Sequence, residues 1–67
     1  MKITLNNTPE EIDIDKITMG ELIKYKNFTF KLLITKINGK LVNKEDRDKT
    51  YIIEGDDVIV LHLISGG

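Results

Sequence analysis

Residues 57–64 read DVIVLHLI, and every side chain after Asp57 except His62 is apolar. Successive side chains of a β-strand point to opposite faces of the sheet. A run that is apolar at both sets of positions therefore predicts a strand with two apolar faces. Such a strand belongs in the centre of a sheet, and we expect the N-terminal strand to be its parallel neighbour.

A hairpin precedes this strand. Residues 32–37 are mostly apolar, Asn38-Gly39 follows, and residues 40–42 are placed to pair back. Asn-Gly is the strongest short hairpin signal, because a type I′ turn needs positive φ at both central residues. The polar residues 43–49 then predict a surface loop, and residues 50–53 predict another short strand.

The N-terminus predicts a second hairpin. Ile3 and Leu5 alternate with polar residues, and residues 11–15 alternate again, which is the period of half-buried strands. Residues 6–9 are turn formers, so we expect the turn there, with Pro9 inside it.

One helix is predicted between the two hairpins. Thr18-Met19-Gly20-Glu21 is a capping-box sequence, in which Thr18 accepts from the Glu21 N–H while Glu21 reaches back to Thr18. Ile17 and Leu22 have the spacing of a hydrophobic staple around the cap. The helix is expected to run from about residue 19 to residue 26.

These elements together predict a single α+β domain over residues 1–67, with the architecture of a β-grasp (ubiquitin-like) fold. A mixed sheet of four to five strands would curl around one helix, and residues 65–67 would form a flexible C-terminal tail. The predicted core consists of Ile3, Leu5, Ile12, Ile14, Leu22, Ile23, Ile37, Val58 and Val60.

Composition excludes several classes of function. Ten Lys and Arg residues against eleven Asp and Glu give a net charge of −1, which argues against a nucleic-acid partner. The chain has no Cys, so disulfides and Cys-ligated zinc are ruled out. No apolar run approaches the ~20 residues of a membrane span, and the first residues lack a signal-peptide layout. We therefore expect a cytoplasmic protein with no membrane association.

The side chains offer little for catalysis. His62 is the only histidine, and Ser65 has no evident base beside it. Asp46 and Asp48 lack the Gly and the distal Glu of a calcium loop, so no metal site is predicted. We expect neither an enzyme nor a bound cofactor.

The final Gly66-Gly67 pair directly follows the long apolar strand. In this setting, the chain resembles the ThiS-like sulfur carriers of thiamin biosynthesis, in the ubiquitin-like superfamily. The motifs that carry the resemblance are MKI (1–3), ITMGELI (17–23), INGKLV (37–42), GDDV (55–58) and GG (66–67).

The resemblance implies chemistry at the C-terminus. The Gly67 carboxylate, preceded by Gly66, would be adenylated and then converted to a thiocarboxylate that donates sulfur for thiazole synthesis. The implied partners are an E1-like (ThiF-like) adenylyltransferase that uses ATP, a thiazole synthase (ThiG-like) and a sulfur-donor enzyme. The carrier would be a protein co-substrate and monomeric when free.

Three alternatives stay open from the sequence. The small subunit of molybdopterin synthase uses the same thiocarboxylate chemistry, a ubiquitin-like modifier would join its terminal glycine to lysines, and a β-grasp binding module would have an inert tail. If the chain is a sulfur carrier, the second face of the last strand would bind the partner enzymes. The residues predicted for that contact are Ile59, Leu61, Leu63 and Ser65.

Overall fold

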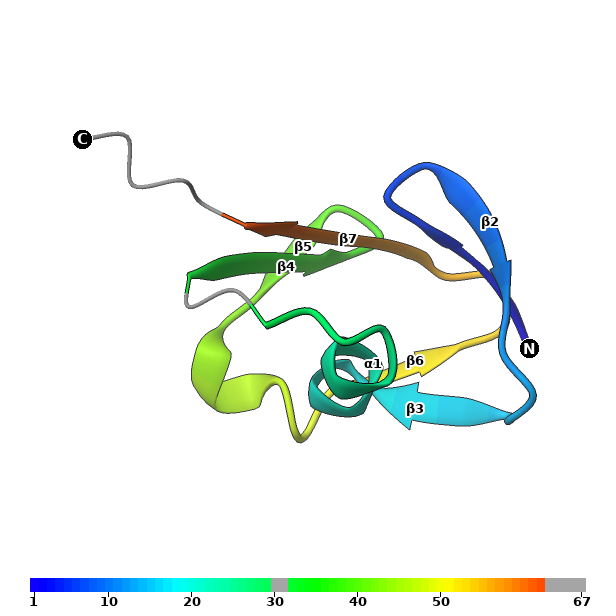
Figure 1. Cartoon of the computed structure of the whole chain (residues 1–67), viewed down its shortest axis with the longest axis horizontal. Coiled ribbons are helices and arrows are strands. Elements are labelled where there is room, and N and C mark those ends of the chain that lie inside the picture. Colours follow the sequence, from blue (N-terminus) through cyan, green and yellow to red (C-terminus); the bar gives the residue numbers. More distant parts are fainter. Residues whose placement is uncertain (30–31, 63–67) are drawn as a thin grey trace.

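The computed structural model describes residues 1–29 and 32–62. The elements in this part of the chain are β1 (Lys2–Leu5), β2 (Thr8–Glu11), β3 (Lys16–Thr18), α1 (Met19–Tyr25), β4 (Leu33–Ile37), β5 (Lys40–Val42), a 3₁₀ turn (Lys44–Asp46), β6 (Tyr51–Ile53) and β7 (Asp57–His62) (Figure 1). No helix in the described ranges has the length and apolar character needed to cross a bilayer.

β7 lies in the centre of a mixed sheet, as predicted. Within the described residues the strand order is β2-β1-β7-β4-β5. β7 is parallel to β1 and antiparallel to β4, with Leu5 opposite Val58 on one side and Thr35 opposite Val60 on the other. β3 and β6 form a separate two-stranded antiparallel sheet. The prediction of a mixed sheet with one helix is confirmed for the described part of the chain.

The N-terminal hairpin differs from the prediction. Its turn is the two-residue segment Asn6-Asn7, in which both residues have positive φ (52° and 65°). Asparagine tolerates this left-handed conformation. The tight turn places Pro9 in β2, opposite Thr4, rather than in the turn. Proline is accommodated there because β2 is an edge strand and does not need every N–H.

The predicted strand over residues 11–15 is also wrong beyond Glu11. The Ile14 N–H donates to the Ile12 carbonyl at 2.8 Å, which closes a short turn and bends the chain out of the sheet. Ile12 stays in the core at 2% exposure, while Ile14 is 46% exposed. Ile14 is therefore an error in the predicted core.

The helix begins as predicted. The Glu21 N–H donates to the Thr18 hydroxyl oxygen at 3.1 Å, and the Thr18 N–H donates to the Glu21 carboxylate at 3.0 Å, which completes the capping box. Ile17 before the cap and Leu22 in the first turn are both buried in one cluster, as a hydrophobic staple requires. The helix ends at Tyr25, one residue earlier than predicted.

The core lies between the inner face of the five-stranded sheet and the layer formed by α1, β3 and β6. The predicted residues Ile3, Leu5, Ile12, Leu22, Val58 and Val60 are buried there, and Ile23 and Ile37 pack against them half-buried. The buried residues missing from the predicted core are Ile17, Met19, Val42 and Ile52.

Asn38-Gly39 forms the turn between β4 and β5, as predicted, with φ of 52° and 83°. The following polar segment is fixed to β4 by Arg47. Its guanidinium donates to the Leu33 carbonyl at 2.7 Å and to the Thr35 hydroxyl at 3.2 Å. Arg47 therefore anchors the predicted surface loop to the sheet.

Candidate functional site

β7 is the element that leads toward the predicted reactive residues. Within it, Ile59 is half-buried and Leu61 is 51% exposed. The other residues predicted to function, Leu63, Ser65, Gly66 and Gly67, lie outside the described residues.

Ile59 and Leu61 share their face of the sheet with apolar side chains of β4 and β5. Leu61 stands opposite Ile34, and Lys36 stands between Ile59 and Leu41. Paired residues of antiparallel strands project to the same face. We call the four apolar residues of this face the outer apolar face: Ile34, Leu41, Ile59 and Leu61.

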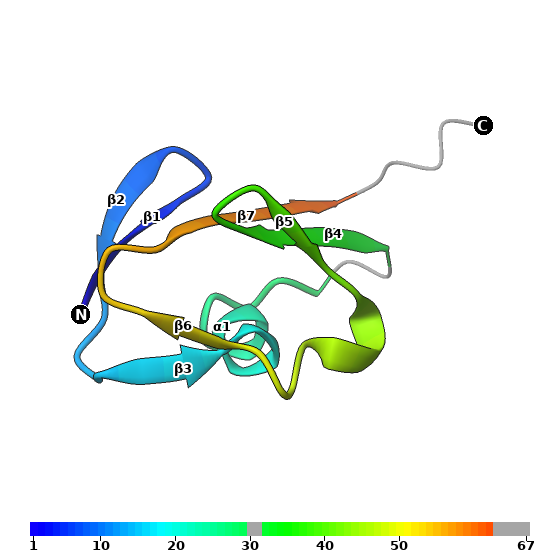
Figure 2. The ribbon, with the colours of Figure 1, turned by 180° about the vertical axis from the view of Figure 1, so that it is seen from behind.

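The outer apolar face points away from the helix. Val58 and Val60 alternate with Ile59 and Leu61 along β7, and they are buried in the same cluster as Leu22 of α1. Figures 1 and 2 show α1, β3 and β6 together on one side of the five-stranded sheet. The prediction that Ile59 and Leu61 lie on the face away from the helix is confirmed, and their part in partner binding stays a prediction.

Two asparagine side chains bond the backbone of β7. At the start of β7, the Asn38 amide oxygen accepts from the Asp57 N–H at 2.9 Å. Further along, the Asn6 amide oxygen accepts from the Val60 N–H at 2.8 Å, and its NH₂ group donates to the Val60 carbonyl at 3.1 Å. Sequence reasoning found Asn38 only as a turn residue, and it assigned no role to the amide of Asn6.

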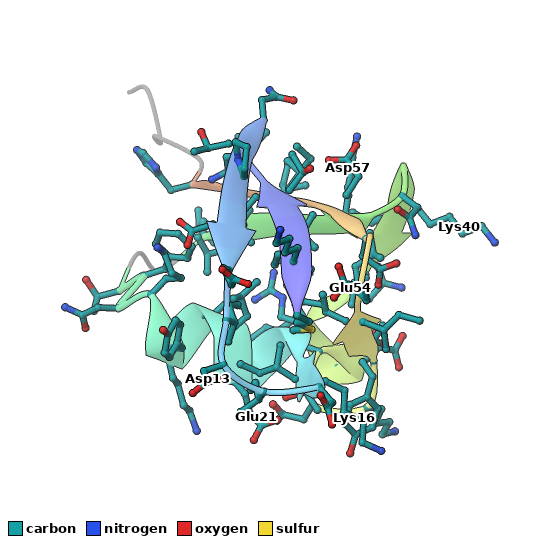
Figure 3. The ribbon with its side chains drawn as sticks, turned by 90° about the vertical axis from the view of Figure 1, so that its right-hand side faces the viewer. Asp13, Lys16, Glu21, Lys40, Glu54 and Asp57 are labelled. Carbon is teal, nitrogen blue, oxygen red and sulfur yellow. The ribbon has the colours of Figure 1, made fainter. Side chains whose placement is uncertain are left out.

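The titratable groups of the described residues do not converge on a catalytic centre. Figure 3 shows Asp13, Lys16 and Glu21 at one end of the view, and Lys40 and Asp57 at the other. The hydrogen bonds that Glu21 receives from the backbone and the hydroxyl of Thr18 lower the pKa of its carboxyl group, and these bonds belong to the helix cap. Within the described ranges, no group of three or more His, Asp or Glu residues could hold a metal ion.

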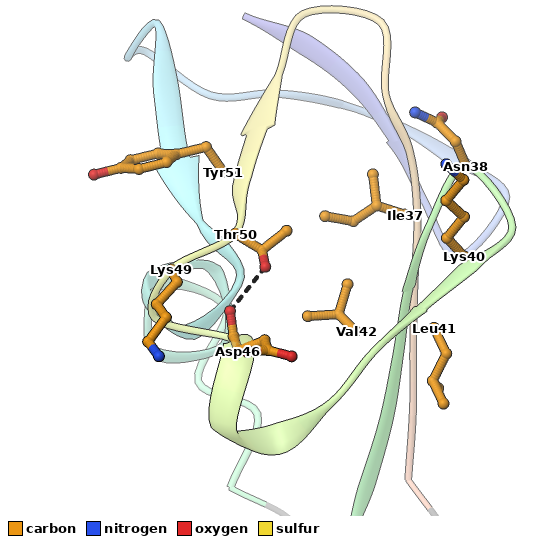
Figure 4. A pocket seen from close by; sticks show the side chains of 9 residues that line it. All are labelled: Ile37, Asn38, Lys40, Leu41, Val42, Asp46, Lys49, Thr50 and Tyr51. Atoms are coloured by element: carbon orange, nitrogen blue, oxygen red, sulfur yellow. Dashed lines mark hydrogen bonds between the residues drawn. The ribbon is translucent and has the colours of Figure 1, made fainter.

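A hollow of about 450 Å³ lies between the β4–β5 hairpin and residues 46–51 (Figure 4). Lys40 and Lys49 line it together with apolar side chains. The Thr50 hydroxyl there donates to the Asp46 carbonyl at 2.8 Å, which stabilises the turn. The hollow sits at the β5 edge, separated from β7 by β4, so we assign it no part in chemistry at the C-terminus.

Comparisons with known proteins agree on one family. The model of the ThiS family matches residues 3–67. The crystal structure of the thiamine biosynthesis protein ThiS from Geobacter metallireducens is similar with a TM-score of 0.90 and 26% identity, over 100% of both chains. The solution structure of a thiamine biosynthesis protein from Geobacter metallireducens matches with a TM-score of 0.81 and 26% identity, over 100% of this chain and 88% of that one. No curated protein matches the sequence.

Proposed function

The chain belongs to the ThiS family of sulfur carriers in thiamin biosynthesis, and from that premise we propose that it carries sulfur as a thiocarboxylate at the carboxyl group of Gly67. The observation that carries the proposal is the match to the family model, which extends through Gly67. The absence of Cys supports it, because the chain has no thiol on which to hold sulfur as a persulfide.

The proposed chemistry has two steps, because a carboxylate is a poor acyl donor. First, a carboxylate oxygen of Gly67 attacks the α-phosphorus of ATP, which releases pyrophosphate and leaves an acyl adenylate. Second, a sulfide equivalent from a sulfur-donor enzyme attacks the acyl carbon, and AMP leaves with the bonding electron pair. The product is a thiocarboxylate, whose sulfur is the nucleophile that a thiazole synthase would accept. The protein is thus a co-substrate rather than an enzyme, and ATP binds to its partner.

Two terminal glycines suit this chemistry for steric reasons. Glycine has no Cβ, so it passes through a narrow channel and adopts backbone angles that other residues avoid. Ser65, Gly66 and Gly67 span roughly 10 Å when extended. That reach lets the carboxylate enter a partner's active site while the folded domain stays outside.

We propose that the outer apolar face binds the E1-like adenylyltransferase. Exposed apolar patches on small proteins usually mark interaction surfaces, and Leu41 and Leu61 are 61% and 51% exposed. Leu61 lies in the strand that leads to Gly67, so docking here would bring the carboxylate to the enzyme that activates it. The cytoplasm, which supplies ATP and keeps thiols reduced, is the proposed compartment.

Mass spectrometry of the intact protein tests the proposal. Incubated with the cognate adenylyltransferase, ATP and a sulfide source, the protein should gain about 16 Da, the difference between sulfur and oxygen. The gain should require ATP. An amide bond between Gly67 and a lysine of another protein would instead indicate a modifier. Failure of the enzyme to exchange pyrophosphate into ATP in the presence of this protein would refute the carrier assignment.

A further inference from the structure

The β4–β5 hairpin leaves one edge of β5 without a neighbouring strand. β5 is the last strand of the five-stranded sheet in the described part of the chain. Ile37 and Lys40 flank the two-residue Asn38-Gly39 turn, so they form the hydrogen-bonded pair next to it. Hydrogen-bonded and non-hydrogen-bonded pairs alternate along an antiparallel ladder. Leu41, opposite Lys36, therefore directs its N–H and its carbonyl away from β4, toward the free edge.

The hollow next to the hairpin opens at this edge. Three consecutive residues of β5, Lys40, Leu41 and Val42, line it (Figure 4). Successive strand residues point to opposite faces, so a hollow that touches all three reaches the edge itself. Lys40 pairs with Ile37, which packs against the core. Val42 pairs with the buried Thr35. Lys40 and Val42 therefore both project to the inner face of the sheet, on which the hollow lies.

The rim of the hollow carries an excess of positive charge. Lys40 and Lys49 line it, and the Lys16 ammonium lies 4.7 Å from the centroid of the Tyr51 ring, which forms part of the wall. Asp46 is the one acidic residue among the described residues that line the hollow. None of the three lysines forms an ion pair within the described ranges. The hollow thus complements an apolar side chain that lies next to a carboxylate.

We propose that the β5 edge binds an extended segment of a partner protein as an added antiparallel strand, an interaction surface beyond the carrier function proposed above. A single residue opposite Leu41 in such a strand can exchange both main-chain hydrogen bonds with it. The residues before and after that one would project into the hollow, an apolar residue beside Val42 and an acidic residue beside Lys40. The partner segment therefore has the pattern apolar-x-acidic.

The length of β5 limits the strength of this contact. The strand has three residues, so an added strand buries less than the roughly 1,200 Å² of a standard stable interface. We expect weak, reversible binding. A small amphipathic anion would use the lysines and the hollow, but it would leave the N–H and carbonyl of Leu41 unused. A peptide segment uses both features, and the experiment separates the two kinds of ligand.

NMR titration of the ¹⁵N-labelled protein with the peptide acetyl-GSTIVETSG-amide tests the proposal. The isoleucine, valine and glutamate of this peptide are placed to lie opposite Val42, Leu41 and Lys40. We expect the amide signals of residues 40–42 and of Tyr51 to shift, and hydrogen exchange of the Leu41 amide to slow. Hexanoate has an apolar chain and a carboxylate but no peptide group, so it should leave these signals in place. Unchanged exchange at Leu41, or equal shifts with hexanoate, would overturn the proposal.

Methylated peptides test the strand pairing without any change to the protein. In the proposed register the valine N–H of the peptide faces β5, whereas the glutamate N–H faces away from it. N-methylvaline should weaken binding by about 5-fold or more, because it removes a hydrogen bond to the Leu41 carbonyl. N-methylglutamate should bind as the unmethylated peptide does. Equal affinities of the two methylated peptides would refute strand addition.

Lys40→Glu tests the acidic position of the motif. It should weaken binding of the peptide by about 5-fold or more, and replacing the peptide glutamate with lysine should restore the affinity. Lys24→Glu makes the same change in net charge at an exposed position of α1, away from the hollow, and should bind like the wild type. Equal losses in the two variants, or no recovery with the lysine peptide, would contradict the contact with Lys40. None of these measurements involves Gly67, so their failure would leave the proposed carrier function intact.

Discussion

The Thr35 hydroxyl donates a hydrogen bond to the Val42 carbonyl at 2.6 Å. Thr35 is fully buried in β4, and Val42 is the last residue of β5. The Thr35 oxygen also accepts from the Arg47 guanidinium at 3.2 Å. One hydroxyl thereby joins the β4–β5 hairpin to the loop that follows it.

Thr35→Val should destabilise the protein by about 1–3 kcal/mol, because it leaves the Val42 carbonyl and an Arg47 N–H without this partner. Valine has nearly the shape of threonine, so packing is preserved. Urea unfolding measures the change. Thr35→Ser keeps the hydroxyl and removes one methyl group, and it should be the milder substitution, at about 1 kcal/mol. The reverse order would show that packing, not the hydrogen bond, accounts for Thr35.

Leu22→Ala should destabilise the domain by about 2–5 kcal/mol, since Leu22 is fully buried where α1 meets the sheet. In a domain this small, that loss is a large part of the total stability. Leu41→Ala is the matched control, because Leu41 is 61% exposed and should change stability by less than about 0.5 kcal/mol. Thermal melting compares the two, and equal melting temperatures would contradict the assigned core.

Much of the fold was predictable because its signals are local. Three local motifs each specify backbone geometry within a few residues: the alternation of Ile3 and Leu5, the capping box at Thr18 and the Asn38-Gly39 turn. The apolar run in β7 added the one long-range expectation, a central strand beside β1, and the sheet order confirms it.

The errors arise where tertiary contacts outweigh a local pattern. Ile14 fits the alternation of a strand, but a short turn at Ile12 sends it outward. Met19 is missing from the predicted core, because its complete burial depends on the β3–β6 layer, whose pairing the sequence did not predict. The Asn6 amide bonds a residue 54 positions away, and no local pattern reveals such a contact.

The candidate site was predictable only in part, for the same reason. The two faces of β7 follow from strand periodicity, and the structure places Ile59 and Leu61 on the face away from the helix, as expected. Ile34 and Leu41 join that face through strand pairing, which periodicity within one segment cannot supply.

Stability should depend on pH through Glu21. Hydrogen bonds from Thr18 lower the pKa of this carboxyl in the folded state. A carboxylate with a lowered folded pKa stabilises the fold above its unfolded pKa, and this contribution is lost as the pH falls through the folded pKa. Glu21→Gln keeps an acceptor in the capping box but does not titrate.

Between about pH 6 and pH 3, the wild type should therefore lose more stability than Glu21→Gln. Urea midpoints measured across this range at constant ionic strength provide the comparison. Other carboxylates titrate equally in both proteins, so their effects cancel in the difference. Parallel curves for the two proteins would mean that the carboxylate form of Glu21 adds nothing to the cap.

Leu61→Glu should weaken binding to the adenylyltransferase by about 10-fold or more, because it replaces an exposed leucine of the outer apolar face with a charge. The fold should persist, since Leu61 is 51% exposed. Ile53→Glu is the control, as Ile53 is a strand residue of similar exposure (54%) in the β3–β6 layer. Calorimetry measures binding, and circular dichroism measures folding. Unfolding of Leu61→Glu, or equal binding losses in both variants, would contradict the assigned surface.

The sharpest prediction concerns Gly67 itself. Deleting Gly67, or adding one alanine after it, moves the terminal carboxylate by about 3.5 Å along the chain and away from the α-phosphorus of ATP that it would attack. Neither protein should gain the mass of a sulfur-for-oxygen exchange. Both should unfold at the same urea concentration as the wild type, because terminal residues contribute little to domain stability. Gly66→Val should slow the reaction for a different reason, since a β-branched side chain restricts the backbone and fills the channel that glycine passes. The rate of thiocarboxylate formation in Gly66→Ala should lie between those of the wild type and Gly66→Val. An extended protein that still formed a thiocarboxylate would place the acceptor elsewhere and refute chemistry at the Gly67 carboxylate.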